Sequence, residues 1–186
     1  MNALTDEQLM EQLKNGETEA IDELYRRYSG KLYAFCRNIT RSEDSDDLVH
    51  DVFTRVIESA STFKPGKASF RTWLFRIARN RCIDFTRREG KIQFVPIEET
   101  VAQSGSVDVE GAIIRKSLIE TVRECLDELK NEQEKYAILL YYISGKVYRE
   151  IGGILGRSTS MAKNRVRAAQ EKVKRCLERK GVDSAA

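Results

Sequence analysis

Residue types that usually mark catalytic or metal sites are scarce in this 186-residue chain. It has one histidine, His50, and no CxxC pair, so the spacings typical of zinc ligands are absent and we expect no metal and no cofactor. The cysteines are far apart in the sequence, and each falls within an apolar helical pattern. They are Cys36, Cys82, Cys125 and Cys176, and we expect buried, reduced thiols, as in a cytoplasmic protein.

Long hydrophobic runs and signal-peptide features are absent as well. No apolar run approaches the roughly 20 residues that a membrane-spanning helix needs. The opening stretch, MNALTDEQLMEQLKNGE, is polar and acidic, without an apolar core. Because 41% of the residues are hydrophobic, the composition argues against wholesale disorder. We therefore expect a folded protein that stays in the cytoplasm.

Alternating runs of β-branched residues, the usual sign of strands, are also missing, and apolar residues recur at helical spacing almost throughout. The stretch EGKIQFVPIEETVAQSGSVDVEG is the exception, since it contains Pro96, is acidic and has no helical period. The sequence therefore predicts an all-α protein of two small helical domains joined by an extended linker. We expect a first module at 1–90, the linker at 91–111, a second module at 112–180 and a tail at 181–186. Helices are expected at 5–16, 18–39, from 45 onward, 70–88, 112–130, 131–145, 147–155 and 158–180.

The net charge of +3 is unevenly distributed along the chain. Residues 64–88 hold eight basic side chains against one acid, and residues 146–180 hold eleven against three. Between 43 and 51 there are five acids and no base. Two separate basic blocks indicate nucleic-acid contacts at two places, and the acidic block indicates a different partner at a third.

The second basic block has the pattern of a helix-turn-helix: a short helix at VYREIGGIL, a turn at Gly156, and a longer helix capped by Ser158. Apolar residues fall on one side of the long helix, and the opposite side carries groups that can bind base edges and phosphates. These are Ser160, Lys163, Asn164, Arg167 and Lys174. A solvated amphipathic helix is the alternative interpretation. Arg165 lies nearer the packed side, where we expect it to pair with an acid such as Glu150.

The acidic block places Asp47 and Asp51 four residues apart, on one face of a helix. Acids in a first helical turn suit the helix dipole, which explains Asp47 but not Asp51. Carboxylates could also serve acid–base or metal chemistry, but no histidine, cysteine or glycine-rich phosphate loop accompanies them. We therefore expect a docking face for a basic partner and no enzymatic activity.

The stretch FRTWLFRIARNRCIDFTRR combines two faces on one helix. Six residues fall within about 120° of the helical wheel and predict a core-facing stripe. They are Phe70, Trp73, Leu74, Ile77, Ala78 and Phe85. The other side carries Arg76, Arg79, Asn80, Ile83 and Arg87, a strip with phosphate-binding character. Trp73 lies at the edge between the two, where an aromatic ring could stack on a base.

Three segments in order, DDLVHDVFTRV, FRTWLFRIARNRCIDFTRR and EIGGILGRSTSMAKNRVRAAQEKVKRCL, resemble the bacterial sigma-70 family. The two-module layout is similar to its extracytoplasmic-function (ECF) group, and the resemblance covers about 18–177. No single motif is decisive, but three in order with the linker between them are highly specific. Gly152 and Gly153 depart from the pattern, which usually has alanine and a polar residue there.

The resemblance implies a promoter-specificity subunit that binds core RNA polymerase at its β′ clamp helices and β flap. The helix from about 46 to 55 would dock on the clamp helices, through Asp47, Asp51, Phe53 and Arg55. The helix at 70–88, with the loop at 61–69, would open the −10 element through Trp73, Arg76, Arg79, Asn80 and Arg87, with Trp73 and Asn80 as candidates for holding a flipped base. The helix from Ser160 would read the −35 element of promoter DNA, and the linker would run toward the RNA exit path.

The resemblance also implies an anti-sigma factor as a further partner, often membrane-anchored, that covers these same surfaces. It implies no small-molecule substrate. Two other function classes remain open from the residues. One is a helix-turn-helix regulator with a sensing or dimerising N-terminal module, and the other is a nucleic-acid enzyme, for which a catalytic constellation is lacking.

Overall fold

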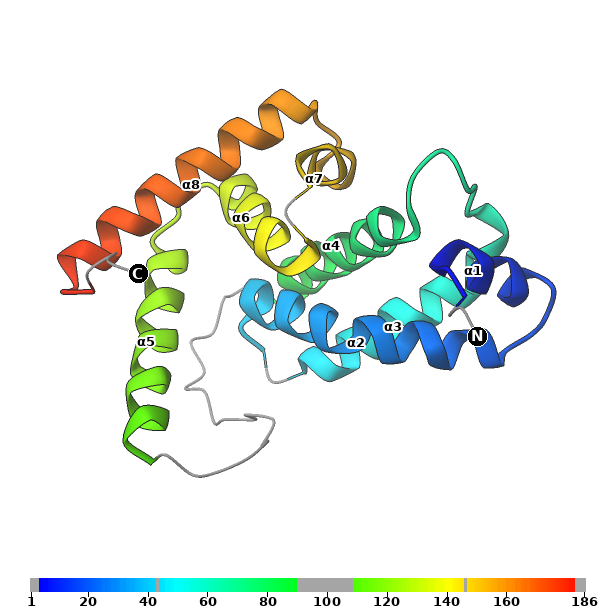
Figure 1. The fold of residues 1–186 in the computed structure, drawn as a ribbon, viewed down its shortest axis with the longest axis horizontal. Helices are drawn as coiled ribbons and strands as arrows, with labels where there is room; N and C mark the ends of the chain where they lie inside the picture. The colour runs from blue at the N-terminus through cyan, green and yellow to red at the C-terminus, as the bar shows by residue number, and fades with distance from the viewer. Residues whose placement is uncertain (1–3, 43, 90–108, 146, 183–186) are drawn as a thin grey trace.

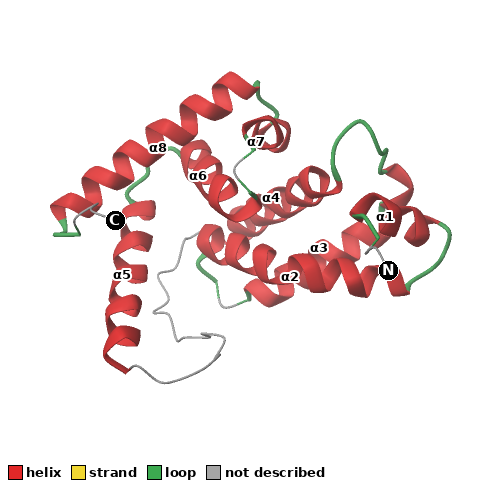
Figure 2. Ribbon diagram, viewed as in Figure 1, coloured by secondary structure: helices red, strands yellow, loops and turns green. Residues whose placement is uncertain are grey.

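The computed structural model describes residues 4–42, 44–89, 109–145 and 147–182, which form helices joined by turns and loops, with no strand among them (Figure 1, Figure 2). The predicted all-α class is confirmed. The first module contains α1 (Asp6–Lys14), α2 (Glu19–Thr40), α3 (Ser45–Glu58), the 3-10 helix η1 (Ala60–Thr62) and α4 (Phe70–Glu89). The second contains α5 (Val109–Asp127), α6 (Glu132–Ser144), α7 (Tyr148–Leu155) and α8 (Thr159–Arg179). Most of the linker predicted at 91–111 lies outside the described residues, as does the tail from 183 onward.

The core of the first module forms between α2, α3 and α4, because each of these helices turns an apolar stripe toward the other two. Phe35 of α2 and Phe75 of α4 are fully buried, with their rings edge to face and their centroids 5.5 Å apart. The other fully buried large side chains of these helices are Leu24, Leu32, Val49, Val52, Val56, Phe70 and Leu74. This packing holds α3 and α4 side by side.

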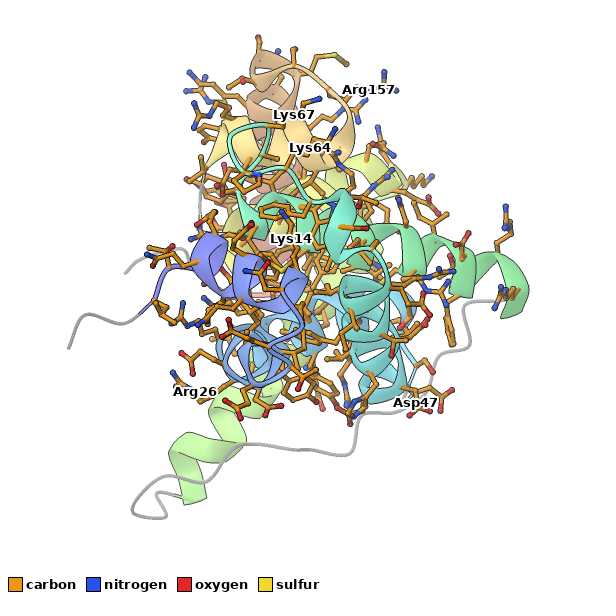
Figure 3. The ribbon with its side chains drawn as sticks, turned by 90° about the vertical axis from the view of Figure 1, so that its right-hand side faces the viewer. Lys14, Arg26, Asp47, Lys64, Lys67 and Arg157 are labelled. Carbon is orange, nitrogen blue, oxygen red and sulfur yellow. A yellow bond between two sulfur atoms is a disulfide. The ribbon has the colours of Figure 1, made fainter. Side chains whose placement is uncertain are left out.

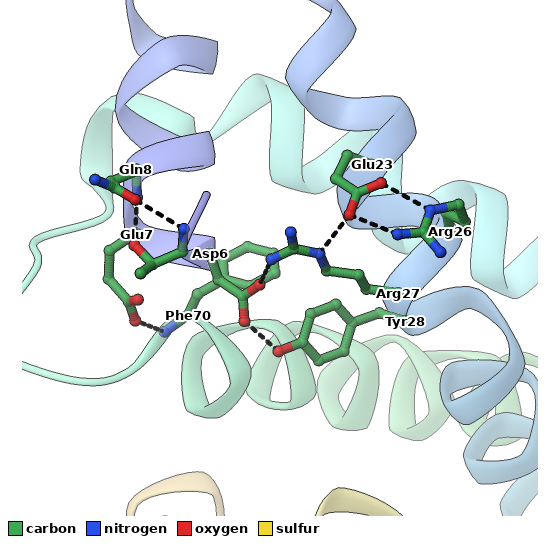
Figure 4. Close-up of polar contacts among 9 residues, drawn as sticks. Asp6, Glu7, Gln8, Glu23, Arg26, Arg27, Tyr28 and Phe70 are labelled. Carbon is green, nitrogen blue, oxygen red and sulfur yellow. Dashed lines mark hydrogen bonds and ion pairs between the residues drawn. The ribbon is translucent and has the colours of Figure 1, made fainter. Parts of the chain in front are cut away.

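Polar contacts attach α1 to the rest of the module (Figure 4). The Arg27 guanidinium donates to Asp6 at 2.8 Å, and the Tyr28 hydroxyl donates to the other oxygen of the same carboxylate. The carboxylate of Glu7 accepts a bond of 3.1 Å from the backbone N–H of Phe70, the first residue of α4. That N–H has no partner within its own helix, so α1 supplies a cap for α4.

These contacts change the acidity of two side chains. Burial, and then the hydrogen bond to Asp6, raise the pKa of the Tyr28 hydroxyl to about 12. Hydrogen bonds from Arg26 and Arg27 lower the pKa of the Glu23 carboxyl to about 2. Both arginines approach Glu23 within 2.7 Å (Figure 4).

Side-chain caps begin two helices of the second module, and the predicted cap at Ser158 is confirmed. The Asn131 side chain accepts from the Gln133 N–H at the start of α6, and the Ser158 hydroxyl accepts from the Met161 N–H at the start of α8. Gly156 ends α7 with φ 64°, a left-handed conformation that favours glycine. The helices α7 and α8 pack together as the predicted helix-turn-helix, and α5 and α6 also pack on α8.

The cysteine prediction is half wrong. Cys36 and Cys82 are buried free thiols, as expected, but Cys125 and Cys176 form a disulfide between α5 and α8. The two residues are 51 positions apart in sequence, yet helix packing brings their Cα atoms to 5.6 Å, within the range that a disulfide requires. Sequence spacing carries no signal of such a pairing.

Candidate functional surfaces

The acidic surface predicted on α3 is present at the start of this helix, where Asp46 and Asp47 are exposed (Figure 3 labels Asp47). Asp51 lies one turn further on and is only partly exposed. Its carboxylate accepts a 2.6 Å hydrogen bond from the Nε of Arg81 on α4, together with a second, shorter bond from the same guanidinium. Asp51 therefore links α3 to α4 in addition to facing solvent.

Of the two other residues predicted on this surface, Phe53 is buried and Arg55 is exposed. Phe53 is only 4% exposed and packs on Tyr25, with the ring centroids 4.8 Å apart, so it belongs to the core and does not face a partner. Its place in the apolar stripe of α3 is the sequence signal for this burial. Arg55 is exposed and pairs with Glu58 on its own helix at 3.0 Å. Of the predicted docking residues, Asp47, Asp51 and Arg55 remain accessible.

Trp73 lies between core and surface, as its place on the wheel predicts. It is partly buried, and its ring lies 5.3 Å from Phe63 and 6.2 Å from Phe70, centroid to centroid. Phe63 belongs to the segment before α4 whose exposed lysines, Lys64 and Lys67, point outward in Figure 3. The partly exposed ring is thus held by the aromatic core, next to Phe63 of this basic loop.

The predicted polar strip of α4 is divided. Asn80 and Arg87 are exposed, and Arg87 makes a 3.3 Å pair with Asp84 on its own helix. Arg76 and Arg79, in contrast, contact the second module: Arg76 donates to the carbonyl of Gly153 at 2.8 Å, and the Arg79 guanidinium lies 5.2 Å from the ring centre of Tyr136. Arg76 nevertheless remains exposed, and Ile83, which was predicted on the same strip, packs against the core.

Further contacts across the two modules lie on either side of these arginines. Ser69 donates to Glu150 at 2.8 Å, and Arg71 donates to the Ser144 carbonyl at 2.9 Å. At the other end, Arg41 pairs with Asp127 at 2.5 Å. Arg41 ends α2 in a left-handed conformation with φ 59°, which directs the chain from α2 toward α3. The helix α7 packs on α4, and α6 packs on α2, so both helices of the second module lie against the first module (Figure 1).

Burial at these contacts shifts the acidity of two further groups. Desolvation raises the pKa of the Tyr136 hydroxyl well above its usual range. Desolvation, followed by the positive charges of Arg37 and Arg41, lowers the pKa of the Arg123 guanidinium. Arg123 also accepts a 3.2 Å bond from Arg41 through its backbone carbonyl.

The predicted DNA-reading face of α8 is open along its whole length. Its five residues, Ser160, Lys163, Asn164, Arg167 and Lys174, are exposed, and Ala162, Val166 and Ala169 on the opposite side are buried. The prediction that Arg165 pairs with Glu150 is wrong, because Arg165 donates to the Gln133 side chain at 2.9 Å. Glu150 instead accepts a hydrogen bond from Ser69 of the first module.

Gly152 explains one departure from the family pattern. A Cβ at this position would lie 2.7 Å from the Arg157 carbonyl oxygen, so the tight turn between α7 and α8 excludes a side chain. Gly153, the other departure, faces α4: a Cβ there would lie 3.2 Å from the Thr72 methyl group. The two glycines thus permit close approach on two sides of α7.

An apolar groove that the sequence reasoning missed opens on the second module between α5, α6 and α8, with a volume of about 550 Å³. Its lining is mainly aliphatic, with Val122, Leu126, Ile138, Leu139, Val173 and Leu177, and Tyr142 at its edge is 59% exposed.

Among the described residues, no cluster of three or more potential metal ligands occurs, and no helix is long and apolar enough to span a bilayer. These surfaces offer binding faces of three kinds: acidic, basic and apolar.

The chain is similar in sequence to known transcription proteins. The Sigma-70 region 2 family model matches residues 24–92. The RNA polymerase sigma factor YlaC of Bacillus subtilis is 32% identical over 161 residues, which cover 84% of this chain and 91% of that protein. The ECF RNA polymerase sigma-E factor of Escherichia coli K12 is 27% identical over 179 residues, covering 91% and 93%.

Two solved structures share the fold. The structure of CnrH in complex with the cytosolic domain of CnrY matches with a TM-score of 0.69 at 24% identity, over 91% of this chain and 95% of that one. The sigma factor RpoE from Bartonella quintana, in complex with the anti-sigma factor NepR, matches with a TM-score of 0.63 at 24% identity, over 84% and 96%. The agreement of the region 2 match, the near full-length relatives and the helical fold assigns this chain to the ECF group of the sigma-70 family, as an RNA polymerase sigma factor.

Proposed function

We propose that this sigma factor divides its work among three surfaces, each with its own partner. The acidic start of α3 docks on core RNA polymerase, α4 with the loop before it holds the opened −10 element, and α8 reads the −35 element. The division rests on one observation: in Figure 1, α3 and α8 lie on opposite sides of the molecule. A polymerase bound at α3 therefore leaves α8 accessible to DNA.

At the docking surface, Asp47 supplies an exposed negative charge for a basic face of the β′ clamp helices. Asp51 and Arg55 extend the charged strip along the next two turns of α3. Contacts of this type mainly set the orientation and the association rate of the complex, and they weaken with added salt.

At the −10 element, Asn80 has the hydrogen-bonding groups to read an exposed base edge, and Arg87 the charge to hold a phosphate. Trp73 offers the edge of a ring anchored in the aromatic core. Extruding a base costs a few kcal/mol, which such contacts offset.

At the −35 element, Ser160 and Asn164 lie in the first two turns of α8, where a recognition helix meets base edges in the major groove. Lys163, Arg167 and Lys174 add phosphate contacts along the same face. Their side chains are exposed in the free protein, so this surface needs no rearrangement before it binds duplex DNA.

The apolar groove of the second module fits an amphipathic segment of the polymerase β flap, in the helix-in-groove mode of recognition. An anti-sigma factor is a further partner of this protein, and its membrane anchoring is part of the proposal. The protein has no catalytic activity of its own and acts in the cytoplasm.

Reconstitution with bacterial core RNA polymerase tests this assignment. We expect the purified chain to form a complex with core enzyme and to support run-off transcription from members of a promoter library. The matched control is the Asp47→Arg variant, which reverses one exposed charge of the docking surface and should weaken the complex. Absence of both core binding and transcription by the unaltered chain would refute the proposal.

A further inference from the structure

We propose that α1 positions the loop that would hold the opened −10 element, with Glu7 as the positioning residue. This inference rests on the proposed role of α4 and of the loop at 61–69. The helix α1 ends at Lys14, before the residues matched by the Sigma-70 region 2 family model, which begin at 24. The matched region therefore does not include α1, and the role of this helix is inferred from its contacts.

The two ends of the loop meet in the aromatic core. Phe63, where the loop leaves the core, is 2% exposed, and Phe70, the first residue of α4, is fully buried. Their rings lie edge to face with the centroids 6.1 Å apart, and Trp73 packs beside both. The residues at 64–69 thus leave the core and return to it at one place. Their position depends on what holds these two ends.

Two side chains of α1 reach the two ends of the loop. The Glu7 carboxylate accepts the 3.1 Å hydrogen bond from the backbone N–H of Phe70 (Figure 4), and the Lys14 Nζ lies 5.7 Å from the ring centre of Phe63. Glu7 and Lys14 are two turns apart and so lie on the same face of α1. This face packs on both η1 and α4. The helix therefore contacts the loop where it leaves the core and where it returns.

The bond from Phe70 to Glu7 fixes where α4 begins. Glu7 also places a negative charge at the positive end of the α4 dipole. The Ser69 hydroxyl supplies a second cap, because it accepts from the Thr72 N–H at 3.2 Å. Without the acceptor at Glu7, the first turn of α4 would fray more readily. That turn connects the end of the loop to Trp73, which is a candidate for holding a flipped base.

Glu7 is itself held firmly, because both of its neighbours in α1 are bonded. The preceding residue, Asp6, accepts from Arg27 at 2.8 Å and from the Tyr28 hydroxyl. The following residue, Gln8, accepts at 2.8 Å from the backbone N–H that precedes the helix. The carboxylate of Glu7 is thus presented from a backbone that is already fixed, as a supporting contact requires.

The loop has a compact tip that carries positive charge. Lys64 and Lys67 are exposed, and the Lys67 N–H donates to the Lys64 carbonyl at 3.2 Å. Gly66 between them has φ 91°, the left-handed conformation that favours glycine. Because the tip is closed by its own turn, a shift of the loop's ends displaces the whole tip. A displacement of about 1 Å can weaken a positioned contact by up to about two orders of magnitude.

Three variants of the full chain test the role of Glu7. Glu7→Ala removes the acceptor, whereas Glu7→Gln keeps an acceptor oxygen and removes the charge. The control, Asp22→Ala, removes an equal charge from an exposed position of α2. Each variant is assembled with core polymerase and titrated with a non-template-strand oligonucleotide from the −10 element of a promoter that the unaltered holoenzyme transcribes. The same oligonucleotide with an abasic site, moved through each position in turn, measures how tightly each base is held.

We expect the unaltered holoenzyme to lose about tenfold in affinity when the flipped base is missing. Glu7→Ala should reduce this loss about fivefold, the change that removal of one helix cap produces, whereas Glu7→Gln and Asp22→Ala should retain it. Affinities for core polymerase and for a duplex with only the −35 element should be the same in all four proteins. These two affinities would fall if Glu7 served only the general stability of the fold.

Three outcomes would overturn the proposal. The first is a Glu7→Ala holoenzyme that still loses about tenfold in affinity without the flipped base. The second is a parallel loss of core binding in that variant. The third is a Glu7→Gln variant as defective as Glu7→Ala, since it would exclude the hydrogen bond as the cause.

Limited digestion of the free chain by trypsin measures the loop without DNA or polymerase. Lys64 is followed by Pro65, which protects its bond, so cleavage after Lys67 reports on the loop. Glu7→Ala should raise the rate of this cleavage about fivefold, and neither Glu7→Gln nor Asp22→Ala should do so. An unchanged rate, or faster cleavage throughout the chain, would contradict a local role of Glu7.

The two measurements separate this inference from the proposed function. If the unaltered holoenzyme showed no position that is sensitive to an abasic site, the proposed capture of a flipped base would be refuted. The digestion would still decide whether Glu7 holds the loop.

Discussion

The Asp51 carboxylate on α3 accepts two hydrogen bonds from the Arg81 guanidinium on α4, one of them 2.6 Å long. The proposed polymerase-docking helix and the proposed DNA-opening helix are thereby joined by a charge pair whose acid is also part of the docking surface. The pair keeps the two helices in register, and it makes Asp51 unlike its neighbour Asp47, which is exposed.

Charge reversal at these two acids should therefore have different effects. Asp51→Arg places a positive charge against Arg81, so we expect it to weaken core-polymerase binding and also to lower the free energy of unfolding by about 1 kcal/mol. Asp47→Arg should weaken core binding to a similar degree and lower the free energy of unfolding by less, about 0.5 kcal/mol, because only its interaction with the helix dipole is lost. Urea denaturation and a core-binding titration on both variants would check this. Equal stability of the two variants would mean that the Asp51–Arg81 pair contributes nothing to the fold.

The difference between Asp47 and Asp51 shows which structural features the sequence predicts and which it does not. Signals that act over a few residues predict local structure well: Ser158 caps the start of α8 and Gly156 ends α7, as predicted. Each depends on neighbours within four residues, where helix geometry determines the outcome.

Contacts between distant segments could not be derived in this way. Asp51 and Arg81 are 30 residues apart, and the cysteines of the disulfide are 51 apart. A helical wheel states which side of a helix packs, but it does not state which helix covers that side. For this reason the wheel predicts a polar strip on α4 but does not predict that Arg76 and Arg79 contact the second module.

Asn80 is exposed on α4, so its proposed role can be tested without removing one of the arginines that contact the second module. We expect Asn80→Ala to reduce promoter opening by core enzyme roughly fivefold to 150-fold, equivalent to the loss of about 1–3 kcal/mol of base contact. Binding of a duplex that carries only the −35 element should not change. Permanganate reactivity of unpaired thymines in the −10 element measures opening directly. A loss of duplex binding in parallel with opening would instead indicate a general defect of the fold.

On α8, two lysines separate DNA contact from internal packing. Lys163 is exposed on the proposed reading face, whereas Lys172 pairs with Glu134 of α6 at 2.7 Å. We expect Lys163→Ala to weaken duplex binding and to reduce the slope of log affinity against log salt by about 1, as the loss of one phosphate contact does. Lys172→Ala removes the same charge from the same helix and should leave that slope unchanged. Affinities measured over a range of salt concentrations distinguish the two, and equal slopes would remove Lys163 from the DNA interface.

The disulfide between Cys125 and Cys176 should make the second module sensitive to reductant. Closing a loop of 51 residues restricts the unfolded chain by about 4 kcal/mol in the chain-entropy treatment, so reduction should lower the free energy of unfolding by up to that amount. Denatured without reductant, the chain should expose only the two thiols of Cys36 and Cys82 to a labelling reagent. A double variant, Cys125→Ala with Cys176→Ala, should unfold identically with and without reductant. Four reactive thiols in the untreated protein would show that this bond is absent.

Tyr28 and Glu23 predict how the stability of the first module depends on pH. The pKa of Tyr28 is raised to about 12 in the fold, because burial and the bond to Asp6 favour its neutral form. Its contribution to stability is therefore complete below its unfolded pKa of about 10 and is lost as pH rises through 12. Glu23 behaves in the opposite sense: its pKa is lowered to about 2, so its contribution is present above its unfolded pKa and is lost as pH falls toward 2.

Absorbance titration of the phenolate measures the first of these effects. The tyrosine signal that Tyr28→Phe removes should be the part that titrates near pH 12, and the same variant should lose the decline in stability that Tyr28 causes between pH 10 and 12. Tyr142→Phe is a suitable control, because Tyr142 is 59% exposed and lies on the second module, away from α1. If Tyr28→Phe instead removed a signal that titrates near pH 10, the hydroxyl would be solvated and its bond to Asp6 would not hold α1 in place.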